Sequence, residues 1–345
     1  MSHPLSDHFD GHRFHNPTNL PFPDAPPPTS TPNRRGSILR WQFGLRPKWP
    51  VDRPTSTYPD APPPEPGELV ATFVNHSTFL LSFGRHGKAP LTVLTDPIFS
   101  ERCSPFRHLG PRRVQPPGLS LDALPRIDVV AVSHCHYDHM DLPTLRFLAE
   151  RDDPACITPL GNRRHLRKAG LTQIVEQDWW EHAQLGDLGI TLTPARHATA
   201  RTPFDANEAL WAGFLFTLAG NEVPSVFFVG DSGHGRHWAM IRERLGAPDL
   251  ALLPIGAYEP RDLMRRVHVN PEEAFEAFRN LGAKRGLGMH FGTFQLTDEG
   301  IDEPPARLRL ATRAAGLPDD TFDTLGNGES RLFSRNAVSQ PDTPS

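Results

Sequence analysis

Hydrophobic residues along the chain predict a series of strands from residue 67 onwards. Runs rich in β-branched and aromatic residues recur between Gly-containing turns, a composition that favours strands. The first two runs flank the turn sequence Gly-Arg-His-Gly-Lys and predict a hairpin. The predicted strands are 68–83, 89–99, 128–133, 189–195, 211–219, 225–230, 250–256 and 285–291.

Apolar residues at helical spacing predict helices between these strands. The spacing occurs at 140–150, at 161–170 and again at 269–282. The last of these has clear ends, because Asn270 is a good N-cap and Gly282 can close the helix. Strands that alternate with helices, after a hairpin at the start, predict mixed sheets covered by helices.

Residues 1–66 differ in composition from the rest of the chain. The chain has 38 prolines, and they crowd this stretch in runs such as 22–32. Proline neither pairs within a sheet nor continues a helix, so we expect an extended N-terminal arm. One domain at 67–335 and a disordered tail at 336–345 would follow it.

One part of the arm, 33–53, mixes cations with aromatic side chains. Two interpretations remain open. This part either lies over the domain with its aromatic rings buried, or it anchors the protein on a lipid surface as a peripheral membrane contact. The residues concerned are Arg34, Arg35, Arg40, Trp41, Phe43, Arg46, Lys48, Trp49 and Arg53.

Composition narrows the choice of partner and compartment. Charged residues make up 22% of the chain and the formal net charge is -4, so no overall basic field attracts nucleic acid. Three cysteines without CxxC spacing argue against a disulfide framework and fit a reducing compartment. The N-terminus has no apolar leader, and no run approaches the ~18 apolar residues of a membrane span. We therefore expect a cytoplasmic protein.

The sequence Ser-His-Cys-His-Tyr-Asp-His-Met-Asp at 133–141 crowds four ligand-type residues together. Protonated imidazoles repel one another and stabilise a core little, so a cation is the usual way to satisfy them together. Residues two apart on a strand point to the same side, so His134, His136 and Asp138 can converge while the turn brings His139 round. Four ligands in one loop are more than a single catalytic metal needs.

Three further ligand-type residues stand just past apolar strands. His197, Asp231 and His290 each have small neighbours that let the backbone approach a shared centre. Strand ends on one rim of a sheet are where such folds gather functional groups. The five histidines and two aspartates match the roughly seven ligands of a hydrolytic two-metal site.

The loop His-x-His-x-Asp-His, followed by a distant His, a Gly-Asp pair and a final His, resembles the metallo-β-lactamase superfamily. That resemblance implies an α/β fold, the four-layer αββα sandwich, with a binuclear metal site at the strand ends. A narrower resemblance covers nearly all of the chain beyond the arm. It is to the N-acyl-phosphatidylethanolamine-hydrolysing phospholipase D family and its bacterial relatives. The blocks AYEPR, HVNPEEA and HFGTF separate this group from lactonases and β-lactamases.

The chain departs from that family's pattern at two places near the expected cleft. Members commonly have Gly-His-Ser where this chain has Asn75-His76-Ser77. They also have Trp-Ser where it has Ala198-Thr199. These departures bear on the choice of substrate more than on metal binding.

The resemblance implies two groups of metal ligands joined by a shared carboxylate. Asp138 and Asp231 are then the carboxylates of the catalytic centre. Two zinc ions are expected, with manganese or iron as alternatives. Zinc lowers the pKa of a bound water to about 7, and the resulting hydroxide would attack the phosphorus of a phosphodiester. The implied groups are His134, His136 and His197 on one ion and Asp138, His139 and His290 on the other, with Asp231 bridging.

Several neighbouring residues keep two interpretations. His76 and His268 either line the cleft or are structural, and Asp141 either supports a ligand imidazole or helps to cap the next helix. Arg261 either contacts a phosphate or pairs with a carboxylate such as Glu259. Tyr137 and Tyr258 are expected to border the pocket, and the isolated histidines His165, His182, His234 and His237 are expected to be structural.

The leading hypothesis is a zinc-dependent phosphodiesterase of the phospholipase D type that acts on N-acyl-phosphatidylethanolamine, a related glycerophospholipid or a small phosphodiester. A lactonase, or another ester or amide hydrolase, would use the same metals on a carbon centre. An oxygen-reducing di-iron protein is a third alternative, although such proteins typically carry Glu where this chain has His136. A metal-stabilised binding module is the fourth. Relatives in the family suggest a homodimer.

Overall fold

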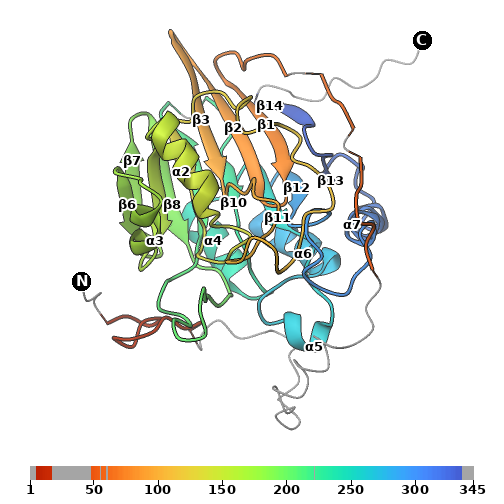
Figure 1. The fold of residues 1–345 in the computed structure, drawn as a ribbon. Helices are drawn as coiled ribbons and strands as arrows, with labels where there is room; N and C mark the ends of the chain where they lie inside the picture. Colours follow the sequence, from red (N-terminus) through yellow and green to blue (C-terminus); the bar gives the residue numbers. More distant parts are fainter. Residues whose placement is uncertain (1–4, 18–47, 55, 60, 221, 336–345) are drawn as a thin grey trace.

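Two seven-stranded sheets lie face to face, with helices on their outer sides (Figure 1). This arrangement confirms the expected αββα sandwich. Most of the predicted cationic and aromatic part of the arm and the predicted tail at 336–345 lie outside the described residues. The computed structural model describes residues 5–17, 48–54, 56–59, 61–220 and 222–335.

The first sheet is antiparallel at one end and parallel at the other. Strands β14, β1, β2 and β3 pair antiparallel, whereas β3, β4, β5 and β6 pair parallel. The predicted run 68–83 is in fact two strands, because the chain turns at His76 and Ser77. Across the sheet the strands are β14 (Ser330–Ser334), β1 (Glu68–Asn75), β2 (Thr78–Arg85), β3 (Lys88–Thr95), β4 (Val129–Ala131), β5 (Ala155–Pro159) and β6 (Ile174–Gln177).

The second sheet is mixed in the same way. Strands β10 to β13 pair parallel, and β7 to β10 pair antiparallel. The carboxyl ends of parallel strands meet at one edge of a sheet, where functional groups gather. Across the sheet the strands are β13 (Phe322–Thr324), β12 (Arg285–Met289), β11 (Leu250–Pro254), β10 (Val226–Phe228), β9 (Gly213–Leu218), β8 (Leu188–Thr193) and β7 (His182–Leu185).

Helices cover the outer faces of both sheets. Leu145 of α2 and Leu166 of α3 join a core cluster with Val130 of the first sheet. On the second sheet, α6 contacts β11 and α7 contacts β13. The helices are α2 (Leu142–Arg151), α3 (Arg163–Lys168), α4 (His237–Leu245), α5 (Arg261–Met264), α6 (Pro271–Leu281) and α7 (Glu303–Ala314).

Helix α6 forms where the sequence predicts it. The backbone N–H of Glu273 donates to the side chain of Asn270 at 2.8 Å, and the Glu273 carboxylate accepts from the backbone N–H of Asn270 at 3.3 Å. This reciprocal pair is a capping box. Gly282 follows the last turn with φ 67, a left-handed conformation that glycine adopts readily.

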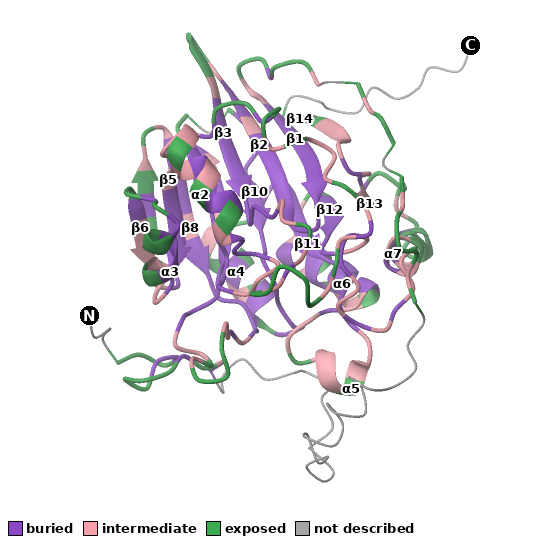
Figure 2. Cartoon of the chain, in the orientation of Figure 1, coloured by how far each residue is buried: buried purple, intermediate pink, exposed green. Residues whose placement is uncertain are grey.

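The largest core lies between the two sheets. Phe73, Phe79 and Phe83 of the first sheet share one buried cluster with Phe214 and Phe216 of the second. Figure 2 shows the central strands buried and the outer sides of the helices exposed. Burying a large apolar side chain stabilises a fold by about 1.5–3 kcal/mol. This shared core therefore fixes the two sheets relative to each other and, with them, their strand ends.

The first described part of the predicted arm, 5–17, packs against the domain. Phe9 and Phe14 are buried in the main core, with ring centroids 4.5 Å apart. The ring of His8 stacks on Trp179 at 4.2 Å, and its Nε2 lies 2.7 Å from Oδ1 of Asp178. These contacts tie this stretch of the chain to the second half of the molecule.

A second described part of the arm, at Trp49, contacts residues 295–299 of the domain. The indole N–H of Trp49 donates to the backbone oxygen of Glu299 at 2.8 Å. Its backbone N–H donates to the side chain of Gln295 at 3.1 Å. For this residue the contacts agree with an arm that lies over the domain. No helix in the described part of the chain is long and apolar enough to cross a bilayer.

Candidate metal centre

The seven residues predicted as ligands meet at one rim of the sandwich. The loop 133–141 leads from β4 into α2, and the other three residues follow β8, β10 and β12. Both sheets therefore contribute strand ends to one cluster. Its members, five of them buried and two partly buried, are His134, His136, Asp138, His139, His197, Asp231 and His290.

The first group consists of three imidazoles that face one point. Nδ1 of His136 lies 3.0 Å from Nε2 of His134 and 3.2 Å from Nε2 of His197. The rings of His136 and His197 stand nearly perpendicular, at 80°. Three ring nitrogens at this separation form a set that could hold one metal ion.

The second group combines a carboxylate with two imidazoles. Oδ2 of Asp138 lies 3.4 Å from Nε2 of His139 and 3.3 Å from Nε2 of His290. The two Nε2 atoms are 3.1 Å apart, and the rings are stacked. Together with His76, these side chains form a second set that could hold another ion.

Asp231 lies between the two groups. Its Oδ2 is 3.2 Å from Nε2 of His139 and 3.3 Å from Nε2 of His290. The same oxygen is 3.9 Å from His134 and 3.8 Å from His197. Oδ1 of Asp231 is buried and has no hydrogen-bond partner among the described residues. One carboxylate thus faces both groups with an oxygen still free to bind.

Unusual backbone conformations surround the cluster. Gly230 has φ 64, and a Cβ there would lie 2.6 Å from Cβ of Ser133, so only glycine lets the next residue approach the loop this closely. Three non-glycine residues at the cluster also have positive φ: His76 at 50°, Asp96 at 34° and His290 at 61°. Such strained conformations concentrate at functional sites.

Burial and mutual repulsion keep the imidazoles of the first group neutral. Burial, followed by the neighbouring His139 and His197, holds the pKa of His134 well below its usual range. Burial also outweighs the carboxylate of Asp231 and lowers the pKa of His197 in the same way. Neutral imidazoles offer the lone pairs that metal ions bind.

The carboxylates behave in the opposite way. Burial would raise the pKa of Asp231, but His290 and His139 outweigh it and the pKa lies well below the ordinary value. Burial would also raise the pKa of Asp138, but the nearby charge of His139 outweighs it, and this pKa too lies well below the ordinary value. Burial would lower the pKa of His139, yet Asp231 and Asp138 raise it well above the usual value. The two ionised carboxylates therefore favour positive charge at the cluster, and the neutral imidazoles of the first group fit borderline cations such as zinc.

Residues 92–291 match the family described as Beta-lactamase superfamily domain, which is more than half of the chain. The chain belongs to the metallo-β-lactamase superfamily. The predicted family and fold are therefore confirmed. With its buried clusters of metal-ligand side chains, it is a metal-dependent hydrolase of this superfamily.

Relatives of this metallo-β-lactamase protein include enzymes that hydrolyse lipids. An uncharacterized protein of Mycobacterium tuberculosis is 37% identical over 305 residues, which is 84% of this chain and 78% of the relative. The N-acyl-phosphatidylethanolamine-hydrolyzing phospholipase D 1 of Caenorhabditis elegans is 33% identical over 274 residues, 76% of this chain and 75% of the relative. A possible metal-dependent hydrolase from Veillonella parvula shares the fold, with a TM-score of 0.60 and 16% identity over 76% of this chain and 98% of that one.

Asp96 supports the metallo-β-lactamase centre from behind and was missed by the sequence analysis. It is fully buried just after β3 and accepts a hydrogen bond from Nδ1–H of His139 at 2.7 Å. It also accepts from the backbone N–H of Ser133 at 2.7 Å. The first bond directs Nε2 of His139 towards the cluster. The predicted strand 89–99 placed Asp96 inside a strand, whereas β3 ends at Thr95 and leaves Asp96 at a strand end, as Asp231 is.

The two histidines with open roles both lie against the cluster. Nε2 of His76 is 3.2 Å from Oδ2 of Asp138, and Nδ1 of His268 is 3.7 Å from Oδ2 of Asp231. Burial first, and then the neighbouring His290, lowers the pKa of His76 to about 3. Burial outweighs Asp231 and lowers the pKa of His268 to about 4. Both side chains are therefore neutral near the centre.

Asp141 takes neither of the two roles considered for it. It stands at the N-cap position of α2 without capping the helix through its side chain. Its Oδ2 instead accepts from the backbone N–H groups of Phe99 and Ser100, at 3.2 and 3.0 Å, and from the hydroxyl of Thr144. Asp141 therefore holds the loop after β3 against the start of α2.

Arg261 forms an internal ion pair, but with a different partner from the one suggested. Its Nη2 lies 2.6 Å from Oε2 of Glu273, whereas Glu259 accepts only from the backbone N–H of Arg261. Nη1 also donates to the backbone oxygen of His268 at 3.0 Å. Arg261 thus connects the capping box of α6 to the segment that carries His268.

The two tyrosines have different surroundings. Tyr137 is partly buried within the ligand loop and donates to the backbone oxygen of Arg201 at 3.0 Å. Tyr258 is fully buried and donates to Oε1 of Glu303 at 2.7 Å. The isolated histidines have local partners, and Nε2 of His237 lies 3.0 Å from the hydroxyl of Ser232.

Proposed function

We propose that the protein is a phospholipase D-type phosphodiesterase that hydrolyses N-acyl-phosphatidylethanolamine or a related glycerophospholipid. Water would add across the phosphodiester bond, and N-acyl-phosphatidylethanolamine would give phosphatidic acid and an N-acylethanolamine. The observation that carries the proposal is the position of Asp231, whose Oδ2 lies within 3.9 Å of ring nitrogens of both groups. The activity named for the Caenorhabditis elegans relative supports the choice of substrate.

The proposed roles follow the two groups and the residue between them. Zinc is the expected metal, with manganese or iron as alternatives. When bound, the ions would acidify water and neutralise charge on the phosphate. One ion would be held by His134, His136 and His197, the other by Asp138, His139 and His290, and both by Asp231.

The chain's own contribution is to hold these side chains in place. Asp96 fixes the tautomer of His139 through its Nδ1–H. The backbone oxygen of Val267 accepts from Nδ1–H of His197 at 3.0 Å, which turns Nε2 of that ring towards the first group. Rings held from behind need little rearrangement on binding an ion, and such preorganisation favours catalysis.

The proposal is tested by assaying the purified protein with each metal against N-acyl-phosphatidylethanolamine and against acyl lactones. We expect turnover of the phospholipid and none of the lactones. Selective turnover of lactones would overturn the phosphodiesterase proposal in favour of a lactonase. Iron as the only activating metal, together with oxygen uptake, would favour the di-iron alternative.

The variant Asp231→Asn tests the shared carboxylate. It should lose bound metal and hydrolysis together, by more than the ~10–100-fold that loss of a supporting residue costs. Asp320→Asn is the matched control, because Asp320 is exposed and pairs only weakly with Arg285 at 3.6 Å. Full turnover by Asp231→Asn would refute the bridging role.

A further inference from the structure

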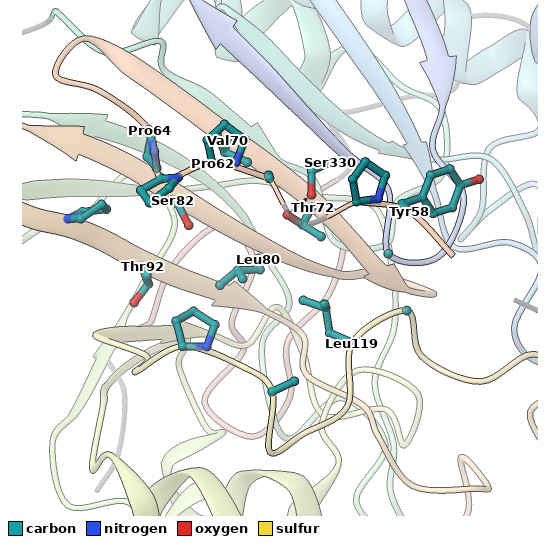
Figure 3. A pocket seen from close by; sticks show the side chains of 18 of the residues that line it. Tyr58, Pro62, Pro64, Val70, Thr72, Leu80, Ser82, Thr92, Leu119 and Ser330 are labelled. Carbon is teal, nitrogen blue, oxygen red and sulfur yellow. Dashed lines mark hydrogen bonds between the residues drawn. The ribbon is translucent and has the colours of Figure 1, made fainter. Parts of the chain in front are cut away.

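A cavity of about 880 Å³ lies on the outer face of the first sheet. None of the seven proposed metal ligands lines it. Side chains of β1 and β2, among them Val70, Leu80 and Ser82, form its floor. Figure 3 shows Pro62 and Pro64 across these strands, with Leu119 on a facing loop. Ligand pockets in proteins typically measure ~300–1,000 Å³, so the space is large enough for a small molecule.

The roof of the cavity consists of residues 56–59 and 61–64, and the chain contacts the domain closely at both ends of this roof segment. A Cβ on Gly84 of β2 would collide with the backbone oxygen of Glu65. A Cβ on Gly326 would collide with the hydroxyl of Tyr58. Gly84 and Gly326 thus let both ends of this roof segment contact the domain closely. The prolines between the two ends lie farther from the sheet, and the cavity is the space beneath them.

The walls of the cavity suit a hydrocarbon chain. Prolines dominate the roof segment and the facing loop, and proline has no backbone N–H to donate. Some hydroxyls on the floor are already engaged, since those of Thr72 and Ser330 bond each other at 2.7 Å. Thr92 bonds the backbone oxygen of Arg126. A ligand that lies against these prolines therefore gains from burying apolar surface.

Two arginines line the same cavity, and they differ in their partners. Nη1 of Arg85 lies 3.3 Å from Oδ2 of Asp187. Arg126 is exposed and its charge acts on Asp152, but its guanidinium forms no ion pair or hydrogen bond within the described parts of the chain. Asp128 also lines the cavity, but its Oδ2 accepts hydrogen bonds from a residue of the floor. A proline-lined chamber with a cation at its edge is complementary to a long chain that ends in a single anion.

We propose that this cavity binds a long-chain fatty acid, with the hydrocarbon chain between the sheet and the roof segment and the carboxylate at Arg126. The ligand would bind on the opposite face of the first sheet from the main core, outside the proposed metal centre. The site is therefore independent of the proposed phosphodiesterase activity.

The proposal is tested with the full chain by titrating palmitate and, separately, its neutral analogue hexadecanol, using calorimetry. Palmitate should bind with one site per chain. Arg126→Gln should weaken the binding of palmitate roughly five- to tenfold, the range expected for an exposed charge-assisted contact. The same variant should bind hexadecanol as the wild type does. Arg309→Gln, an exposed arginine on α7 outside the cavity, is the matched control and should change neither ligand.

A second set of variants tests whether the ligand occupies the cavity itself. Ser82→Phe fills it from the floor and should abolish binding of both ligands. If that variant fails to fold, Leu119→Trp fills the same space from the facing loop. Asp231→Asn should bind palmitate like the wild type. The proposal is overturned if palmitate does not bind, if a folded cavity-filling variant still binds it, or if Asp231→Asn loses it.

Discussion

Asp96 illustrates what single residues contribute to the centre and why the sequence shows only part of it. The seven predicted ligands were found because they are metal-binding types at the ends of strands, and the structure brings them together. Asp96 also follows a strand in the structure, but the sequence predicted that strand to continue to residue 99, which placed Asp96 inside it. Its function depends on a bond to the rear nitrogen of His139, and a hydrogen bond between residues 43 positions apart leaves no spacing signal.

Replacing Asp96 with Asn should therefore weaken metal binding. The amide cannot accept from both His139 and Ser133 as the carboxylate does, so the ring of His139 loses its fixed orientation. We expect a ~10–100-fold loss of metal affinity, measured by competition with a graded chelator. Asp128→Asn is the control, since Asp128, just before β4, accepts from the backbone N–H of Thr92 in β3. Equal chelator resistance in Asp96→Asn and wild type would contradict this role.

At the scale of elements, strong local signals predicted well and weak ones did not. Helix α6 has an N-cap, an apolar face and a closing glycine, and its observed bounds lie inside the predicted range. Helix α7 begins with Glu-Pro-Pro and has few buried residues, so its apolar spacing was too sparse to detect. The edge strands β7 and β14 are short and partly exposed, and their pairing with distant neighbours decides their conformation.

The capping box of α6 should contribute measurably to stability. Asn270→Ala leaves the N–H of Glu273 without its acceptor and should lower the free energy of unfolding by ~1 kcal/mol. Arg279→Ala on the exposed side of the same helix should change it by less than ~0.5 kcal/mol. Denaturant titration of the three proteins measures both values. If the two variants unfold alike, the cap has no special role.

At the scale of the whole molecule, Asp249 connects strands of both sheets. It accepts from the backbone N–H of Ser225, before β10, and pairs with Lys284, before β12, at 2.7 Å. It also pairs with Arg335, after β14 of the first sheet, at 2.7 Å. Burial would raise the pKa of Asp249, but Lys284, Ser225 and Arg335 outweigh it and lower the pKa to about 2.

This lowered pKa predicts acid sensitivity with a definite sign. A carboxyl whose pKa is lower in the folded protein stabilises the fold above its ordinary value of 3.8, and that contribution is lost as the pH falls towards about 2. Asp249→Asn should therefore be less stable than the wild type near neutral pH, with a difference that shrinks below the ordinary pKa. Denaturant unfolding across this range measures it, and Asp320→Asn at an exposed, loosely paired carboxylate serves as control. A difference that stays constant with pH would exclude the linkage.

The proposed centre also draws on both sheets, so metal and fold should be coupled. The loop after β4 belongs to the first sheet, whereas the residues after β8, β10 and β12 belong to the second. An ion that binds only this folded arrangement stabilises it by RT ln(1 + [L]/Kd), or ~2.7 kcal/mol at a hundredfold excess over Kd.

Removing metal with a chelator should thus lower the melting temperature by several degrees, and adding zinc back should restore it. In Asp231→Asn the chelator should have little effect, because the residue that faces both groups is lost. Asp320→Asn should respond like the wild type. If neither chelator nor zinc changes the melting temperature of the wild type, the histidine cluster does not bind metal in the folded protein. That result would also refute the proposed hydrolytic centre.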